Sequence, residues 1–180
     1  MTTAFRPANE LMVQYAAYHR DRRNIATHFV GIPLIVFAVG VFLARAHFEL
    51  GGVRVTPAWI AWALATAWYL TRGNLLLGVA VSFANGVLIA LAHPFAVGST
   101  GAWLGVGFGA FVLGWMLQFI GHYYEGRKPA FVDDLVGLLV GPMFVTGEAL
   151  FAAGLCRPLA EEIERRTGPT LLRDLAHPIT

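Results

Sequence analysis

Residues 102–125 read AWLGVGFGAFVLGWMLQFIGHYYE, a run whose only Asp, Glu, Lys or Arg is its last residue, Glu125. The uncharged stretch begins after Arg72, so about 50 residues pass without a formal charge, enough for two bilayer crossings of about 20 residues each. These runs are continuously apolar and do not alternate, so they predict membrane-spanning helices rather than the strands of a membrane barrel.

The composition of the whole chain indicates the same class. Of its 180 residues, 57% are hydrophobic and 13% are charged, and the mean hydropathy is +0.60. A disordered chain has low hydrophobicity, and a nucleic-acid-binding domain needs clustered basic residues, whereas this chain has a single lysine, Lys128. These values argue against disorder, a soluble helical bundle and nucleic-acid binding. The lone cysteine, Cys156, excludes an internal disulfide and a cysteine-based zinc site.

We therefore predict an all-α fold, a multi-pass transmembrane helical bundle with four to five membrane helices. The apolar runs place the spans at about 29–45, 57–70, 75–91, 102–120 and 135–155. Whether the fifth run crosses the membrane or enters and returns is left open. The membrane domain is expected to cover 1–156, followed by a charged cytosolic tail over 157–180. Glycines in the fourth span would allow helices to pack closely within one chain or in a homo-oligomer.

Basic residues set the expected orientation, because cytoplasmic loops of membrane proteins are enriched in Arg and Lys. Cytoplasmic positions are predicted for Arg20, Arg22, Arg23, Arg72, Arg127 and Lys128, with Arg45 and Arg54 as exceptions in an outer loop. The segments around His19 and His122 then lie on one membrane face, which we expect to be the cytoplasmic face of a bacterial inner membrane.

Polar side chains are costly at membrane depth and mark functional sites by default. Gln118, His122 and Glu125 are spaced i, i+4 and i+7, which places them on one stripe of a helix. A histidine and a carboxylate on adjacent turns can reach one metal ion. The alternative is a hydrogen bond between His122 and Glu125 at a hydrated helix end.

His19 and His28 are nine residues apart, which puts them on opposite faces of a straight helix. They can converge only if the helix breaks between them, and Asn24 is a suitable cap for a new helix that begins at Ile25. The alternative is that each histidine simply lies at the membrane interface.

The two clusters together form a plausible metal site. Three histidines and a carboxylate suit iron, zinc or manganese, and no thiolate is present to favour copper(I) or an iron–sulfur cluster. Candidates for orienting the ligands are Tyr18, Asn24, Gln118 and Tyr123. Glu148 stands within an apolar run, so it must be paired, protonated or ligating.

At these positions the sequence resembles the fungal-type 2-hydroxy fatty acid dioxygenases, a membrane family. The matching residues are Tyr18, His19 and Asn24, then His28, Gly31 and Pro33, then Gln118, Gly121, His122, Glu125, Pro129 and Ala130, and finally Pro142, Phe144, Val145 and Glu148. The resemblance runs from about residue 15 to residue 148.

The resemblance implies an iron(II)-dependent alpha-oxidation, in which a 2-hydroxy fatty acid and dioxygen give the acid one carbon shorter. It implies that His19, His28 and His122 bind iron, with Glu125 as a further ligand or as a partner of the ligands. A long-chain acid dissolved in membrane lipid would present its carboxylate at the interface where these residues lie. Charge and position suggest that Arg127 or Lys128 pairs with that carboxylate.

Two other classes stay open at this point. A haem-binding membrane protein would place histidines of two spans face to face at one depth. A small transporter or assembly factor would be non-enzymatic, but transporter sites lie near the bilayer midplane, whereas these polar clusters lie at one interface.

Overall fold

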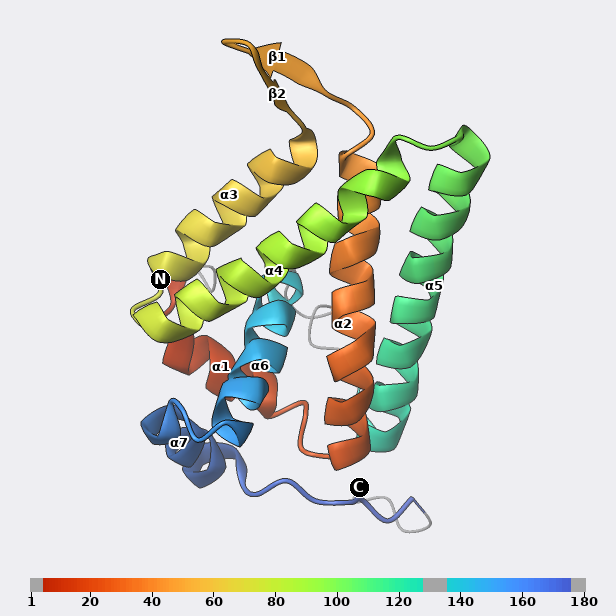
Figure 1. Cartoon of the computed structure of the whole chain (residues 1–180). Helices are drawn as coiled ribbons and strands as arrows, with labels where there is room; N and C mark the ends of the chain where they lie inside the picture. The colour runs from red at the N-terminus through yellow and green to blue at the C-terminus, as the bar shows by residue number, and fades with distance from the viewer. Residues whose placement is uncertain (1–4, 128–135, 176–180) are drawn as a thin grey trace.

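The computed structural model describes residues 5–127 and 136–175 (Figure 1). Its elements are α1 (Ala8–Ala16), α2 (Arg22–Leu43), β1 (Phe48–Leu50), β2 (Val53–Val55), α3 (Pro57–Leu70), α4 (Leu75–Ala96), α5 (Thr100–Glu125), α6 (Gly137–Ala152) and α7 (Arg157–Thr167). Strands β1 and β2 form a short antiparallel hairpin. The predicted helical membrane bundle is confirmed.

Three helices, α2, α4 and α5, are long and apolar enough to cross a membrane. Helices α6 and α7 bend by 112° at their junction and make a fourth candidate if the pair is one broken span. Helix α3 has the predicted bounds, but its 14 residues extend about 21 Å, short of the roughly 30 Å hydrocarbon core. The described residues therefore give three to four candidate spans, one fewer than the predicted four to five.

Helices α2 and α5 run side by side (Figure 1), and glycines set their distance. A Cβ added to Gly31 of α2 would lie 2.8 Å from the carbonyl oxygen of Gly114, and a Cβ on Gly114 would lie 2.8 Å from that of Gly31. A Cβ on Gly121 would collide with Thr27 and lie 2.5 Å from Oδ1 of Asn24. Only glycine permits these approaches without a shift of the neighbouring helix, and they bring the start of α2 against the end of α5.

The predicted break between His19 and His28 is confirmed, because α1 ends at Ala16 and α2 begins at Arg22. The predicted cap was wrong. Asp21 caps α2 by accepting a hydrogen bond from the Arg23 backbone N–H (2.8 Å), and Asn24 lies inside the helix. An Asp cap satisfies an N–H that would otherwise be orphaned at the helix start, and here it starts the helix three residues before the predicted Ile25.

The C-terminal part of the chain packs onto the same end of the bundle as α1 (Figure 1). Leu159 and Ile163 of α7 are buried in the main hydrophobic core. Residues 168–175, here called the C-terminal strap, then follow the turn before α2. Leu171 donates to the carbonyl of Arg20 (2.9 Å) and accepts from the N–H of Arg22 (3.0 Å). The segment expected to form a charged tail thus covers the α1–α2 turn.

Candidate metal centre

Three histidines meet where α1, α2 and α5 converge. His19 lies in the α1–α2 turn, His28 lies in α2, and His122 lies in the last turn of α5. One ring nitrogen from each lies within 4.8 Å of the others, and all three residues are buried. The prediction that these histidines converge on one end of the bundle agrees with this arrangement.

Hydrogen bonds fix which nitrogens of two rings are free. Nδ1 of His19 lies 2.7 Å from the carbonyl oxygen of Tyr15, and Nδ1 of His28 lies 2.9 Å from that of Asn24. Because a carbonyl can only accept, each Nδ1 carries the proton and each Nε2 presents a lone pair. The two Nε2 atoms face each other at 3.0 Å, so two acceptors point at one spot.

Such a pair requires a cation to offset its repulsion. Burial, followed by the neighbouring His28 ring, lowers the pKa of His19 well below its ordinary value, which disfavours a proton as that cation. Two nitrogens bonded to one ion at about 2.1 Å, the zinc–histidine distance, lie about 3.4 Å apart at the tetrahedral angle and about 3.0 Å apart at a right angle. The donor set therefore fits a divalent metal ion.

The third ring lies beside this pair, with one ring nitrogen within 4.8 Å of the other two ligand atoms. The His122 ring centroid lies 4.9 Å from that of His19 and 5.1 Å from that of His28. Its buried Nδ1 has no partner at hydrogen-bond geometry among the described residues, although the ring does interact with the backbone of Arg127. An unpaired buried nitrogen is costly, which is a further reason to expect a ligand here.

Glu125 serves the turn that carries His19. Its carboxylate accepts from the backbone N–H groups of Arg20 (3.0 and 3.1 Å) and Asp21 (2.8 Å) and from the side chain of Asn24 (3.0 Å). Among the described residues, the group that could hold a metal contains the three histidines without Glu125. The Glu125 carboxylate oxygens accept hydrogen bonds from the α1–α2 turn and so link α5 to that turn.

Asn24 and Tyr18 link the same elements. The Asn24 amide also donates to the backbone carbonyl of Tyr18 (3.2 Å), while its own backbone carbonyl holds His28. Asn24 thus contacts the turn, Glu125 and one histidine. The sequence analysis placed both residues near the ligands without identifying these partners.

Tyr15 is a site residue that the sequence analysis missed. Its ring stacks on His19, with centroids 4.2 Å apart and planes 4° from parallel, and it is buried. Burial raises the pKa of its phenol. The signal that could have found it is its position four residues before His19 at a helix end, where its carbonyl accepts from the Tyr18 backbone N–H (3.0 Å) and can accept a side chain as well.

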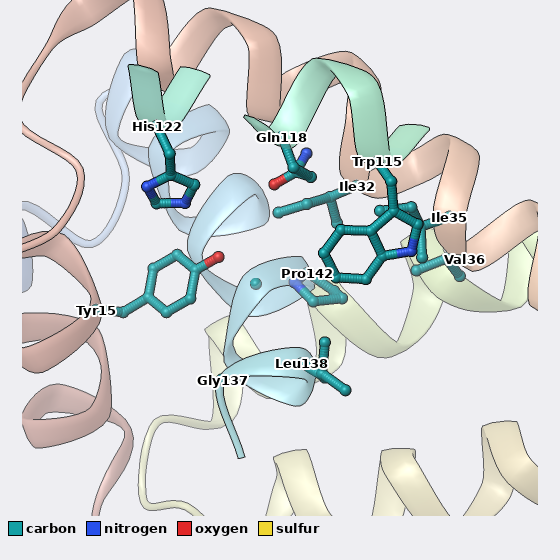
Figure 2. A pocket seen from close by; sticks show the side chains of 11 residues that line it. Tyr15, Ile32, Ile35, Val36, Trp115, Gln118, His122, Gly137, Leu138 and Pro142 are labelled. Atoms are coloured by element: carbon teal, nitrogen blue, oxygen red, sulfur yellow. The ribbon is translucent and has the colours of Figure 1, made fainter. Parts of the chain in front are cut away.

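A narrow pocket of about 60 Å³ opens beside His122 (Figure 2). We call it the apolar pocket; it is lined by Tyr15, Ile32, Ile35, Val36, Trp115, Gln118, His122, Gly137, Leu138, Gly141 and Pro142. His122, Gln118 and Trp115 follow one stripe of α5, from the histidines toward the middle of the helix. Nε2 of Gln118 is buried without a hydrogen-bond partner among the described residues.

The remaining candidates lie around this centre. Arg127 donates to the carbonyl of Ala17 (2.9 Å) and lines a second pocket with His122. Glu148 lies apart from the histidine group, in a polar pocket that also contains Arg20 and Arg22. Lys128 is outside the described residues.

Comparison with known proteins places the chain in a family. The family model described as "2-hydroxy-palmitic acid dioxygenase Mpo1-like" matches residues 5–153. The chain is also 31% identical, over 156 residues covering 83% of each protein, to the 2-hydroxy-palmitic acid dioxygenase MPO1 of Saccharomyces cerevisiae. The chain belongs to the Mpo1-like family. No solved structure matches it.

The Mpo1-like match contains all three histidines and Glu125 but ends before α7. The elements that hold the rings therefore lie within the family region. The C-terminal strap, which contacts the α1–α2 turn, lies outside it.

Proposed function

We propose that this Mpo1-like protein is an iron(II)-dependent dioxygenase that converts a 2-hydroxy fatty acid to the acid one carbon shorter. The observation that carries the proposal is the pair of unprotonated Nε2 atoms, 3.0 Å apart, with a third buried imidazole beside them. The family membership and the activity named for the yeast relative support the same reaction.

The overall reaction balances with dioxygen as the only oxidant. The bond between C1 and C2 breaks, C2 is oxidised to the new carboxyl group, and C1 leaves as carbon dioxide with one molecule of water. Iron(II), when bound, would supply electrons to dioxygen and a positive centre for the substrate oxygens.

The protein's own residues hold this site in place. Carbonyls of Tyr15 and Asn24 fix the tautomers of His19 and His28, as outer partners of metal-binding histidines generally do. Glu125 and Asn24 fasten the α1–α2 turn. Phe144 packs against the rings of both Tyr15 and His19 and keeps water from that side.

Because three neutral imidazoles add no negative charge, a bound divalent ion keeps its charge of +2. That positive charge favours an anionic substrate. The apolar pocket begins at His122 and leads along α5 past Trp115. An acid dissolved in the bilayer would have its carboxylate near the histidines and its chain toward the lipid. The proposal places the site at the cytoplasmic face of a bacterial inner membrane.

The haem alternative is disfavoured by the 3.0 Å distance between Nε2 of His19 and Nε2 of His28. Two imidazole nitrogens on opposite sides of one iron lie about 4 Å apart, given bonds of about 2.0–2.1 Å. The observed separation of 3.0 Å joins rings from a turn and its following helix.

The test is oxygen consumption by purified protein reconstituted with iron(II) and given 2-hydroxypalmitate. We expect one iron per chain and formation of the C15 acid. His122→Ala should abolish turnover while the protein still folds. Failure of iron(II) to bind, or iron binding without oxygen uptake, would contradict the proposal.

A further inference from the structure

His122 borders two pockets of opposite character. One is the apolar pocket described above. The other, here called the basic pocket, measures about 400 Å³ and is lined by His122, Tyr123, Tyr124, Gly126, Arg127, Arg173, Asp174 and Leu175. A molecule with one charged end and one hydrocarbon end could therefore place each end in a matching environment on either side of His122.

Arg173 reaches the basic pocket from the C-terminal strap. Its backbone N–H donates to Oδ2 of Asp21 (2.9 Å), and its carbonyl accepts from the Arg23 side chain (2.8 Å). Its guanidinium packs against the end of α5 at Gly126, where a Cβ would collide with it. Gly126 has φ +65°, so this position suits glycine for its backbone as well as its size.

Among the described residues, no acid forms an ion pair with the Arg173 guanidinium. The residue is half-buried, and its side chain makes no hydrogen bond or ion pair to any other described residue. Its backbone is anchored on both sides, so the strap orients a cation into the pocket. A half-buried cation without a counterion favours an anionic ligand.

The other charges near the pocket leave this excess in place. Arg127 uses one nitrogen on the carbonyl of Ala17 and keeps its other donors. Glu125 is adjacent, but its carboxylate accepts from the backbone N–H groups of Arg20 and Asp21 and from the Asn24 side chain, and it forms no ion pair with Arg127 or Arg173. Among the described residues that line the pocket, the acid is Asp174, and it is exposed to solvent.

We propose that Arg173, with Arg127, binds the carboxylate of the substrate and so selects free acids over neutral lipids. This inference rests on the proposed function, since it names the residues that receive the charged end of that substrate. The hydrocarbon chain then enters the apolar pocket on the other side of His122. Arg173 is thus a specificity-determining residue that the strap adds from outside the family region.

The experiment measures binding without turnover. Iron-loaded protein in detergent, kept free of oxygen, is titrated with 2-hydroxypalmitate and with its uncharged methyl ester. Arg173→Met keeps the length of the side chain and removes its charge, and Arg165→Met is the matched control on the exposed face of α7. We expect Arg173→Met to weaken acid binding about 10- to 100-fold and to leave ester binding and iron content unchanged, while Arg165→Met changes neither.

Arg173→Lys provides a second comparison. Lysine keeps the charge but lacks the forked donors that match a carboxylate, so its loss of acid affinity should lie between those of wild type and Arg173→Met. If Arg173→Met does not fold, a selective loss of acid affinity in Arg173→Lys still supports the proposal, and an unchanged affinity contradicts it.

Three results would overturn the inference. In the first, Arg173→Met loses affinity equally for the acid and the ester. In the second, Arg173→Met binds the acid as tightly as the wild type does. In the third, the wild type itself binds the acid no more tightly than the ester. Because no oxygen is present, the outcome does not depend on whether the protein oxidises the acid. If the wild type turns over the acid but Arg173→Met binds the acid normally, this inference is rejected and the proposed function is not.

Discussion

The two ends of the bundle each hold buried or half-buried histidine, and they use it differently. At the hairpin end, His93 of α4 holds the carbonyl of Ile89 through Nδ1 (2.8 Å), and its Nε2 meets the Thr56 hydroxyl (3.1 Å). At the other end, His19 and His28 also hold the carbonyl four residues earlier through Nδ1, but each Nε2 meets the other.

The difference lies in the partner of the second nitrogen. A hydroxyl can donate or accept, so it satisfies His93 whatever the tautomer. Two imidazole lone pairs cannot satisfy each other. A buried histidine becomes a metal candidate only when its second nitrogen lacks a partner that can donate a hydrogen bond. Substitutions at the two ends of the bundle test this difference.

The largest effect is expected from the histidines themselves. His28→Ala should reduce iron affinity more than about 100-fold, since even outer partners of ligands contribute about 10- to 100-fold, and turnover should fall with it. His93→Ala is the control and should retain both. Iron content after gel filtration and oxygen uptake measure the two effects. If His28→Ala and His93→Ala lost iron equally, the proposed difference between the histidines at the two ends of the bundle would be wrong.

Glu125→Gln should have the next largest effect. The amide keeps one acceptor oxygen but loses the charge that receives the backbone N–H groups of Arg20 and Asp21. We expect a loss of about 1–3 kcal/mol in unfolding free energy and roughly a 10-fold loss in iron affinity. Iron titration separates the roles, because a direct iron ligand would show the larger loss expected for His28→Ala.

A smaller, pH-dependent effect is expected from Asp21. Burial alone would raise its pKa, but hydrogen bonds from the Arg23 side chain and from the backbone N–H groups of Arg173 and Arg23 outweigh burial and lower the pKa to about 2. Because the native pKa is depressed, this stabilisation is complete above pH about 4 and is lost as the pH falls through about 2. Its size is about 2 kcal/mol.

Thermal unfolding of wild type and Asp21→Asn across this range checks the expectation. The variant should be less stable at pH 6 and should approach the wild type near pH 2. A constant difference between the two proteins over the whole range would show that the ionised Asp21 carboxylate is not the source of the stabilisation.

The smallest effect concerns the ion pair between α1 and α7. Arg166 lies 2.7 Å from Glu10, and its hydrogen bond lowers the pKa of that exposed carboxyl. Exposed pairs contribute little to stability. Glu10→Gln should therefore leave iron content unchanged and shift the unfolding temperature barely beyond measurement error, with a smaller shift in high salt.

Local pattern in the sequence predicts much of this molecule. Missing charges predict the helices, and the spacing of Gln118, His122 and Glu125 predicts one stripe of α5. The nine-residue separation of His19 and His28 requires the break that the structure contains. The last two of these inferences use residues within about three turns of one another.

Long-range pairing accounts for the features that the sequence did not reveal. The donors that occupy Glu125 belong to a turn about a hundred residues earlier, and Arg173 meets Asp21 through a strap whose composition carries no periodic signal. The choice of Asp21 over Asn24 as the cap also depends on that strap, because the carboxylate of Asp21 serves Arg23 and Arg173 together. Such contacts arise from the packed fold and leave no pattern of spacing.

X-ray absorption at the iron edge of anaerobically reconstituted protein tests the central claim most directly. The account predicts three imidazole nitrogens bound to one iron in wild type and two in His28→Ala if any iron remains, with no change in His93→Ala. An iron bound without imidazole would contradict it. So would variants lacking His19, His28 or His122 whose spectra are the same as that of the wild type.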